Sequence, residues 1–341
     1  MKILITGGAG FIGSNFIRYL LASHPEHTVI NIDKLTYAGN LENLRDIEHL
    51  PSYTFIRGDI CDRDLIESIE FEAVIHFAAE SHVDRSILDA FPFLQTNVIG
   101  TQNLLEAVRK RNCRMLHVST DEVYGSIEHG LFTEESRISP NSPYAASKAS
   151  SDLLVRAYHE TYGMDIMITR CSNNYGPYQF PEKLIPLVIS HALQGKAIPV
   201  YGDGQNVRDW VHVRDHNRAV DMVFHHAKAG DVYNIGGRNE QKNIDIIRTL
   251  LATIAEKTGM DRENLFRLIT FVKDRLGHDR RYAIDPAKIE ATLGWRPETA
   301  FDQGLADTVT WYLENKRWWE RIISGEYLEY YKVQYGGRFT E

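Results

Sequence analysis

The sequence predicts an α/β fold built on a doubly wound parallel sheet, and three observations support this. Short runs of β-branched residues alternate with stretches of helical periodicity through the first half of the 341-residue chain. A glycine-rich turn follows the first of these runs. Polar residues follow the fifth run, at the edge where open parallel sheets place ligands.

The expected elements come in a regular order. Strands are predicted at 3–6, 29–32, 53–56, 73–77 and 115–119, and helices at 11–22, 96–111 and from residue 143 onward. Ser142 is expected to cap the last of these helices, and Pro143 suits its first turn.

The second half of the chain has a looser pattern. Prolines and a turn at 201–204 follow Arg170, yet a strand at 231–235 and a helix at 244–257 are still expected. We therefore predict a Rossmann-like doubly wound parallel sheet with a smaller, interleaved α/β C-terminal region.

Composition and charge exclude several classes of protein. The chain is 43% apolar and 25% charged, as in ordinary globular proteins, and its net charge is 38 − 46 = −8, which argues against nucleic acid as a partner. Its three cysteines form no CxxC pair, so we expect no disulfide framework and no metal site. We also expect no signal peptide, no membrane span and a cytoplasmic location.

The first turn carries glycines at 7, 10 and 13, between a strand and a helix. Glycine at these places permits a tight turn, close approach of a diphosphate, and close packing of helix on strand. Asp33 follows twenty residues after Gly13, where a carboxylate would bind an adenosine ribose and repel a 2′-phosphate. This favours NAD over NADP, although Lys34 lies next to Asp33. Asp59 and Ile60 suit an adenine contact, or a simple turn at a strand end.

Tyr144 and Lys148 stand four residues apart, on one face of the predicted helix. A neighbouring ammonium and a nicotinamide cation would favour the tyrosine phenolate, which can then exchange a proton with a substrate hydroxyl. The same spacing occurs in any amphipathic helix. The catalytic interpretation is favoured because a second polar group, Thr120, Asp121 and Glu122, follows the fifth strand.

Longer motifs link the chain to a known family. They are GGAGFIG (7–13), DKLTYAGNL (33–41), AAESHVDRS (78–86), TDE (120–122), Tyr144 with Lys148, and NNYGPYQFPEKL (173–184). On these motifs the chain resembles the extended short-chain dehydrogenase/reductase family, and within it the nucleotide-sugar 4,6-dehydratases. The resemblance covers nearly the whole sequence.

The resemblance implies NAD as cofactor, dTDP-glucose as substrate and a homodimer formed through the helices at 96–111 and 144–162. It implies that Tyr144, tuned by Lys148, takes the sugar 4-hydroxyl proton while Thr120 binds the forming carbonyl. Glu122 would then remove the C5 proton and Asp121 would protonate the leaving C6 hydroxyl. A dehydratase needs such a base and acid together, whereas an epimerase does not.

The resemblance also implies two sets of binding residues. For NAD they are Gly7, Gly10, Phe11, Ile12, Gly13, Asp33, Lys34, Leu35, Thr36, Asp59, Ile60, Phe77, Ala78, Ala79, Ser81, Thr96, Tyr144, Lys148 and Asn174. For the sugar nucleotide they are Ser81, Thr120, Asn173, Lys183, Leu184, Pro199, Val200, Tyr201, Arg208, Asn243, Arg275 and His278. Leu276 stands where the family usually has proline, which frees the backbone between Arg275 and His278.

Two domains are expected on this basis. Residues 1–173 with about 210–242 would bind NAD and hold the catalytic groups, and 174–209 with 243–341 would bind the sugar nucleotide. The alternatives are a dehydratase, epimerase or decarboxylase for a UDP- or CDP-sugar, and a non-catalytic NAD-binding sensor on the same fold.

Overall fold

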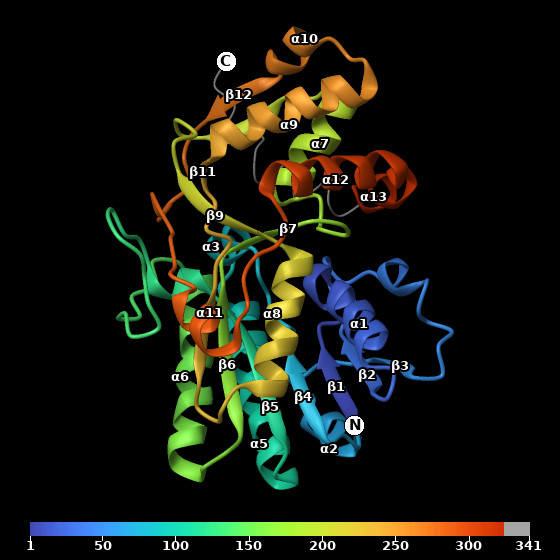
Figure 1. Ribbon diagram of the computed structural model, residues 1–341, viewed down its shortest axis with the longest axis vertical. Coiled ribbons are helices and arrows are strands. Elements are labelled where there is room, and N and C mark those ends of the chain that lie inside the picture. Colours follow the sequence, from blue (N-terminus) through green and yellow to red (C-terminus); the bar gives the residue numbers. More distant parts are fainter. Residues whose placement is uncertain (324–341) are drawn as a thin grey trace.

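A computed structural model describes residues 1–323 of the chain, and Figure 1 shows a larger lobe around one sheet and a smaller lobe beside it. The large sheet has seven parallel strands in the order β10-β6-β5-β4-β1-β2-β3. They are β1 (Lys2–Thr6), β2 (Thr28–Asp33), β3 (Tyr53–Arg57), β4 (Ala73–His76), β5 (Arg114–Thr120), β6 (Ile166–Cys171) and β10 (Val232–Ile235). The predicted Rossmann-like fold is confirmed.

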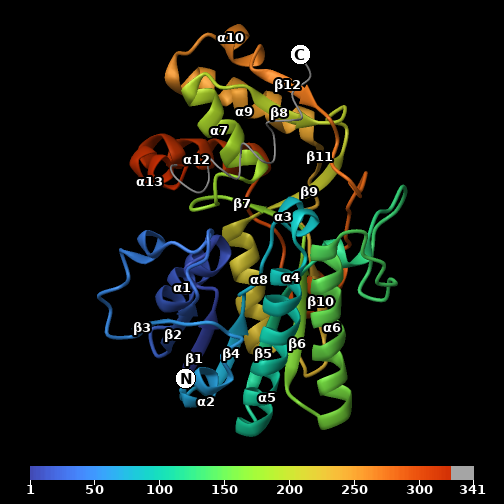
Figure 2. The same ribbon diagram turned by 180° about the vertical axis from the view of Figure 1, so that it is seen from behind.

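Helices cover both faces of this sheet (Figures 1 and 2). On one face lie α1 (Phe11–Ser23) and α8 (Val213–His226), which bury Phe16 and Phe224. On the other lie α2 (Arg63–Ser68), α5 (Thr101–Arg111) and α6 (Pro143–Tyr162), which bury Leu104 and Val155. Two separate apolar cores therefore hold the sheet from its two sides.

The smaller lobe contains two small sheets and a layer of helices. The sheets are β11-β9-β7 and β12-β8, formed by β7 (Asn173–Tyr175), β8 (Ile198–Tyr201), β9 (Val207–His212), β11 (Glu240–Lys242) and β12 (Ile269–Val272). The helices are α7 (Leu184–Gln194), α9 (Asn243–Thr258), α10 (Arg262–Phe266), α12 (Phe301–Glu314) and α13 (Lys316–Ile322). Trp210, Tyr312 and Trp319 lie in their common core.

The chain passes between the lobes several times. After the smaller lobe it returns to the larger one as α11 (Ala287–Leu293), where Ile289 and Trp295 pack in the core that α1 and α8 share. The indole Nε1 of Trp295 donates to the Asp215 carbonyl at 3.0 Å. Ile289 and Trp295 fall in the range 243–341, which was expected to bind the sugar nucleotide. The last part of that range, residues 324–341, lies outside the described chain. We propose that 287–295 belongs with the large sheet.

One predicted helix differs from its expected form. The segment at 96–111 is part of a longer run made of α4 (Phe91–Phe93), the π-helical η2 (Leu94–Gly100) and α5. Within η2, the main-chain carbonyl of Asn97 accepts a hydrogen bond from the Ser151 hydroxyl on α6 at 2.6 Å. This carbonyl is therefore bonded to a residue outside its own helix.

Within residues 1–323, every helix is too short or too polar to cross a bilayer.

Candidate active site

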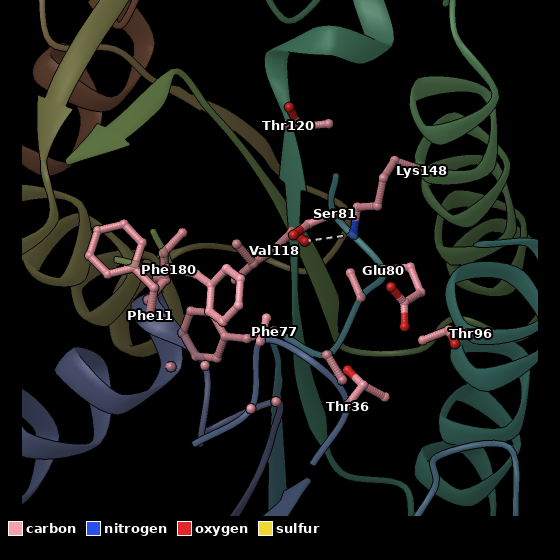
Figure 3. Close-up of a pocket in the computed structure, with 18 of the residues that line it drawn as sticks. Phe11, Thr36, Phe77, Glu80, Ser81, Thr96, Val118, Thr120, Lys148 and Phe180 are labelled. Atoms are coloured by element: carbon pink, nitrogen blue, oxygen red, sulfur yellow. Dashed lines mark hydrogen bonds between the residues drawn. The ribbon is translucent and has the colours of Figure 1, made fainter. Parts of the chain in front are cut away.

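Two adjoining cavities open at the carboxyl ends of the large sheet. The first, of about 310 Å³, is lined by the glycine turn, the end of β2, the end of β5 and α6 (Figure 3). The second, of about 170 Å³, lies against α7, β8, β9 and the segment from 275 to 282. Glu122, Asn173, Glu182 and Lys183 line both, so the two cavities meet at these residues.

The glycine turn has the shape needed for close contact with a ligand backbone. Gly7 has a φ of +73°, and a Cβ there would lie 2.6 Å from the Ala78 backbone. A Cβ at Gly13 would lie 2.4 Å from the Gly7 carbonyl oxygen. Gly10 begins α1 and offers no side-chain cap, so the first amides of this helix remain available to a diphosphate.

Asp33 is held at the edge of the same cavity by main-chain donors. Its carboxylate accepts the Ala9 amide at 2.9 Å and the Leu35 amide at 2.8 Å. Burial raises the pKa of Asp33, and these two hydrogen bonds oppose the rise. Lys34 is paired with Asp59 at 2.7 Å, which reduces its value as a partner for a 2′-phosphate.

The residues predicted to bind the cofactor line the first cavity, with one exception. Leu35 does not line it, because its side chain packs against the core beneath the sheet and only its amide supports Asp33. The roles of the others remain predictions. Phe11, Phe77 and Phe180 lie close together on one side of the cavity in Figure 3.

The helix that begins at Pro143 places Tyr144 and Lys148 beside β5. Ser142 caps it by accepting the Ala145 amide at 3.1 Å, as expected. The Lys148 Nζ donates to the Val118 carbonyl at 2.9 Å, the bond drawn in Figure 3. Burial lowers the pKa of Lys148 to about 8.

Without a bound cofactor, the surroundings of Tyr144 favour its protonated phenol. Burial raises its pKa well above the ordinary value, Glu122 raises it further, and a hydrogen bond with Thr120 opposes the rise. Lys148 does not reverse this, because its own charge is disfavoured by burial and its Nζ is bonded to Val118. An additional positive charge near the phenol is needed before Tyr144 can act as a base.

Thr120, Asp121 and Glu122 sit at the buried end of β5. The Thr120 hydroxyl oxygen accepts the Glu122 amide at 3.3 Å and starts the short helix η3 (Asp121–Tyr124). Asp121 Oδ2 and Glu122 Oε2 are buried and have no hydrogen-bond partner within residues 1–323. Buried polar atoms of this kind are ready to bind a ligand.

The two carboxyls have different electrostatic surroundings. Burial raises the pKa of Asp121 well above its ordinary value, and Glu122 and Asp209 raise it further. Burial also raises the pKa of Glu122, but Arg275, Arg208 and Lys183 oppose it. Because two adjacent buried carboxyls do not both ionise easily, these surroundings favour the proton on Asp121 and the charge on Glu122.

The second cavity has a basic wall. The Arg208 guanidinium is buried 4.1 Å from the centre of the Tyr282 ring and donates to the Asp279 carbonyl at 2.9 Å. The Arg275 Nη1 lies 4.0 Å from Asp84 Oδ1, and its buried Nε has no hydrogen-bond partner in the described chain. This wall can bind a diphosphate through charge-assisted hydrogen bonds.

The residues predicted to bind the sugar nucleotide divide between the two cavities. Ser81 and Thr120 line the first, Asn173 and Lys183 line both, and the others line the second. Leu276 is 74% exposed, whereas Arg275 before it and His278 after Gly277 line the second cavity. Arg275 and His278 therefore both line this cavity with leucine where the family usually has proline.

Sequence reasoning assigned no role to Glu182, which is buried where the cavities meet. Burial raises its pKa to about 7, while Arg85, whose Nη2 lies 3.1 Å from Glu182 Oε2, opposes the rise. Asp84 and Tyr282 in the second cavity were also missed. For Glu182 the available signal was its position next to Lys183.

Comparison with known proteins gives a consistent result. The family model described as GDP-mannose 4,6 dehydratase matches residues 4–308. The dTDP-glucose 4,6-dehydratase of Salmonella typhimurium is 51% identical over 365 aligned residues, which cover 99% of this chain and all of that protein. The dTDP-glucose 4,6-dehydratase of Actinoplanes is also 51% identical, and the alignment covers 94% of this chain and all of that protein.

Solved structures agree with this. The dTDP-glucose 4,6-dehydratase from Streptomyces venezuelae, with NAD and dTDP bound, is 51% identical with a TM-score of 0.89, covering 94% of this chain and all of that one. UDP-glucose 4-epimerase from Thermotoga maritima, with UDP-glucose, is 29% identical with a TM-score of 0.83, covering 93% of this chain and all of that one.

The raised pKa of Asp121 leads to a prediction about stability. A carboxyl whose pKa is higher in the folded state binds more protons when folded, so its ionisation costs stability as the pH rises above about 4. Asp121→Asn should therefore stabilise the ligand-free protein, and the gain should grow by up to about 1.4 kcal/mol per pH unit between pH 5 and 8. Thermal melting at several pH values measures this.

The exposed carboxyl of Asp307 provides the matched control. Asp307→Asn should change the melting temperature by an amount that does not grow with pH. A gain from Asp121→Asn that stays constant or shrinks between pH 5 and 8 would contradict the electrostatic description of the pair.

Proposed function

We propose a role for each catalytic residue on the premise that this chain belongs to the family of dTDP-glucose 4,6-dehydratases. The chain is an NAD-dependent hydro-lyase that converts dTDP-glucose to dTDP-4-keto-6-deoxyglucose and water. The observation that carries the proposed roles is the adjacent pair Asp121 and Glu122 at the end of β5, each with a buried carboxyl oxygen that has no hydrogen-bond partner within residues 1–323.

The first cavity fits NAD. The open amides at the start of α1 suit its diphosphate, and the carboxylate of Asp33, with lone pairs left after its two main-chain bonds, suits a ribose. NAD bound there would supply the acceptor and donor of the hydride exchanged with the sugar, and a positive charge that would lower the pKa of Tyr144.

Tyr144 acts first, as the base that takes the proton of the sugar 4-hydroxyl. Thr120 donates a hydrogen bond to the carbonyl that forms at C4, which requires its hydroxyl to turn away from Asp121 Oδ1, now 3.3 Å away. The new carbonyl acidifies the hydrogen on C5. The next step therefore needs a second base and an acid.

Glu122 and Asp121 supply that base and acid. Glu122 removes the C5 proton, and Asp121 gives its proton to the departing C6 hydroxyl, which leaves as water. The charge on Glu122 is maintained by Arg208, Arg275 and Lys183, which come from the smaller lobe. An epimerase has no task for this pair, so the dehydratase is favoured over the epimerase alternative.

Arg208 and Arg275 also suit the diphosphate of the substrate, and Lys183 lies where the two cavities meet. We propose that Pro199, Val200 and Tyr201 on β8 face the base. The preference for thymine over uracil or cytosine follows from the relatives and not from a contact seen in this chain.

The substrate can be tested directly. The NAD-loaded enzyme, incubated in parallel with dTDP-, UDP- and CDP-glucose, should release a 4-keto-6-deoxy sugar nucleotide most rapidly from dTDP-glucose, as followed by NMR. A 4-epimer as the product, or faster turnover of UDP- or CDP-glucose, would contradict the assignment.

Glu122→Gln should separate the two halves of the reaction. Loss of the general base should slow exchange of the C5 hydrogen with deuterated water by about 10²- to 10⁴-fold, while oxidation at C4 stays detectable in a single turnover. Glu128→Gln, at an exposed site, is the matched control and should leave both steps unchanged. Equal loss of both steps in Glu122→Gln would refute the role of Glu122 as base.

We further propose a homodimer formed through α5 and α6, which lie side by side in Figure 2. The run from α4 to η2 exposes Phe91, Leu94 and Ile99, and α6 exposes Leu153 and Tyr162, each at least half exposed. An apolar surface of this kind is typical of an interface, and a second copy of the chain offers the same surface by two-fold symmetry.

The unpaired thiols of all three cysteines suit the cytoplasmic location that we propose.

Leu153→Glu tests the dimer. It should convert a particle of twice the chain mass into a monomer in sedimentation velocity, because a buried carboxylate in the interface has no partner. Phe271→Glu, at a residue of similar exposure on β12, should leave the mass unchanged. A monomeric parent protein, or a Leu153→Glu variant that remains dimeric, would exclude this interface.

A further inference from the structure

We propose that His24, His27 and His225 bind a divalent transition-metal ion of the zinc type, at a place separate from the catalytic cleft. His24 follows the end of α1, His27 precedes β2, and His225 lies in the last turn of α8. One nitrogen from each ring lies within 4.8 Å of the other two. The expectation of no metal rested on the cysteines, and this cluster has no local motif because His27 and His225 are 198 residues apart.

Two of the ring nitrogens already have the spacing of metal ligands. His27 Nε2 and His225 Nε2 lie 3.3 Å apart. Two nitrogens bound to a tetrahedral zinc at about 2.0–2.1 Å are separated by roughly 3.3–3.4 Å. His24 is the looser member, since its ring stacks on that of His225 at 4.5 Å, and its 25% exposed side chain must turn to complete the site.

Asp221 supports the cluster and offers a fourth ligand. Asp221 and His225 are four residues apart on one face of α8, and the Asp221 carboxylate lies 3.0 Å from His24 Nε2. The His225 Nδ1 donates to the Asp221 main-chain carbonyl at 3.0 Å, which directs the Nε2 lone pair toward His27 Nε2. Metal-binding histidines commonly have such a hydrogen bond at the second ring nitrogen.

The remaining charged groups determine the proton balance. The Met1 ammonium lies 3.4 Å from His27 Nδ1, so without metal the His27 Nε2 carries the hydrogen that it shares with His225. A metal ion bound at Nε2 requires the other tautomer, in which the hydrogen moves to Nδ1, so the Met1 ammonium must turn away and the neutral ring releases no proton. Glu26 Oε1, 3.6 Å from His24 Nδ1 and 3.7 Å from His27 Nδ1, can accept the Nδ1 hydrogens of the metal-bound form.

Three imidazoles and one carboxylate favour zinc, copper or nickel over magnesium and calcium, which prefer oxygen ligands. The ion would join the turn between α1 and β2 to the end of α8. Because α1 starts at the catalytic edge of the sheet and ends at the other, the metal would act on stability and not on the dehydration.

Calorimetric titration tests the site on the full chain without a histidine tag, after treatment with a chelator. Zinc chloride should bind at one equivalent and raise the melting temperature, whereas magnesium chloride should do neither. His27→Ala and His225→Ala should each weaken zinc binding by about 100-fold or more. This loss is larger than the roughly 10- to 100-fold loss expected for a residue that only forms a hydrogen bond with a metal ligand. His226→Ala, at the adjacent exposed histidine, should bind zinc like the parent protein.

The proposal is overturned if the parent protein shows no one-equivalent binding of zinc, or if magnesium binds equally well. Retained affinity in both His27→Ala and His225→Ala would also overturn it. Dehydratase activity of these variants without zinc reports whether they are folded. In crystals of the parent protein soaked in zinc chloride, an anomalous peak between His27 Nε2 and His225 Nε2 supports the site whatever the variants do, and its absence contradicts it.

Discussion

The burial of two adjacent carboxyls, Asp121 and Glu122, is the constraint on which the arrangement of the cleft depends. Two negative charges cannot share a buried site at low cost. The molecule meets this constraint in two ways: burial favours the protonated form of Asp121, and the charges of Arg208, Arg275 and Lys183 favour the ionised form of Glu122. These three cations come from the smaller lobe, so the lobe that borders the substrate cavity also sets the charge state of the catalytic pair.

The large sheet explains why these groups meet. The carboxyl ends of β1, β2 and β5 lie along one edge, so the glycine turn, Asp33 and Thr120 border a single cavity although they are far apart in sequence. The helix α6 adds Tyr144, whose pKa is raised by burial and by Glu122. The phenol therefore remains protonated until a cation is bound nearby, which links its activity as a base to the presence of the cofactor.

Local patterns predicted the parts of the site that local chemistry determines. Gly7 and Gly13 are required because a Cβ at either position would collide with the backbone of Ala78 or of Gly7. Asp33 stands at the end of a strand, and Ser142 caps the start of a helix. Each of these features can be recognised in a short stretch of sequence. The identity of the family came from longer motifs.

Features that depend on tertiary contacts were not predictable in this way. The return of Trp295 to the first core, the π-helical turn at Leu94–Gly100 and the burial of Glu182 between two cavities leave little local signal. The raised pKa of Tyr144 is another case, since it depends on the burial of groups from different elements. Neighbourhoods formed by residues more than a hundred positions apart need the folded structure.

The central claim is that one cleft oxidises C4, eliminates water across C5 and C6, and returns the same hydride to C6. Turnover of dTDP-glucose carrying deuterium at C4 tests it most directly, with the product examined by NMR and mass spectrometry. The deuterium should appear in the C6 methyl group of the 4-keto product while C5 gains hydrogen from solvent. Deuterium that remains at C4 of a sugar product, or is lost from the sugar, would contradict it.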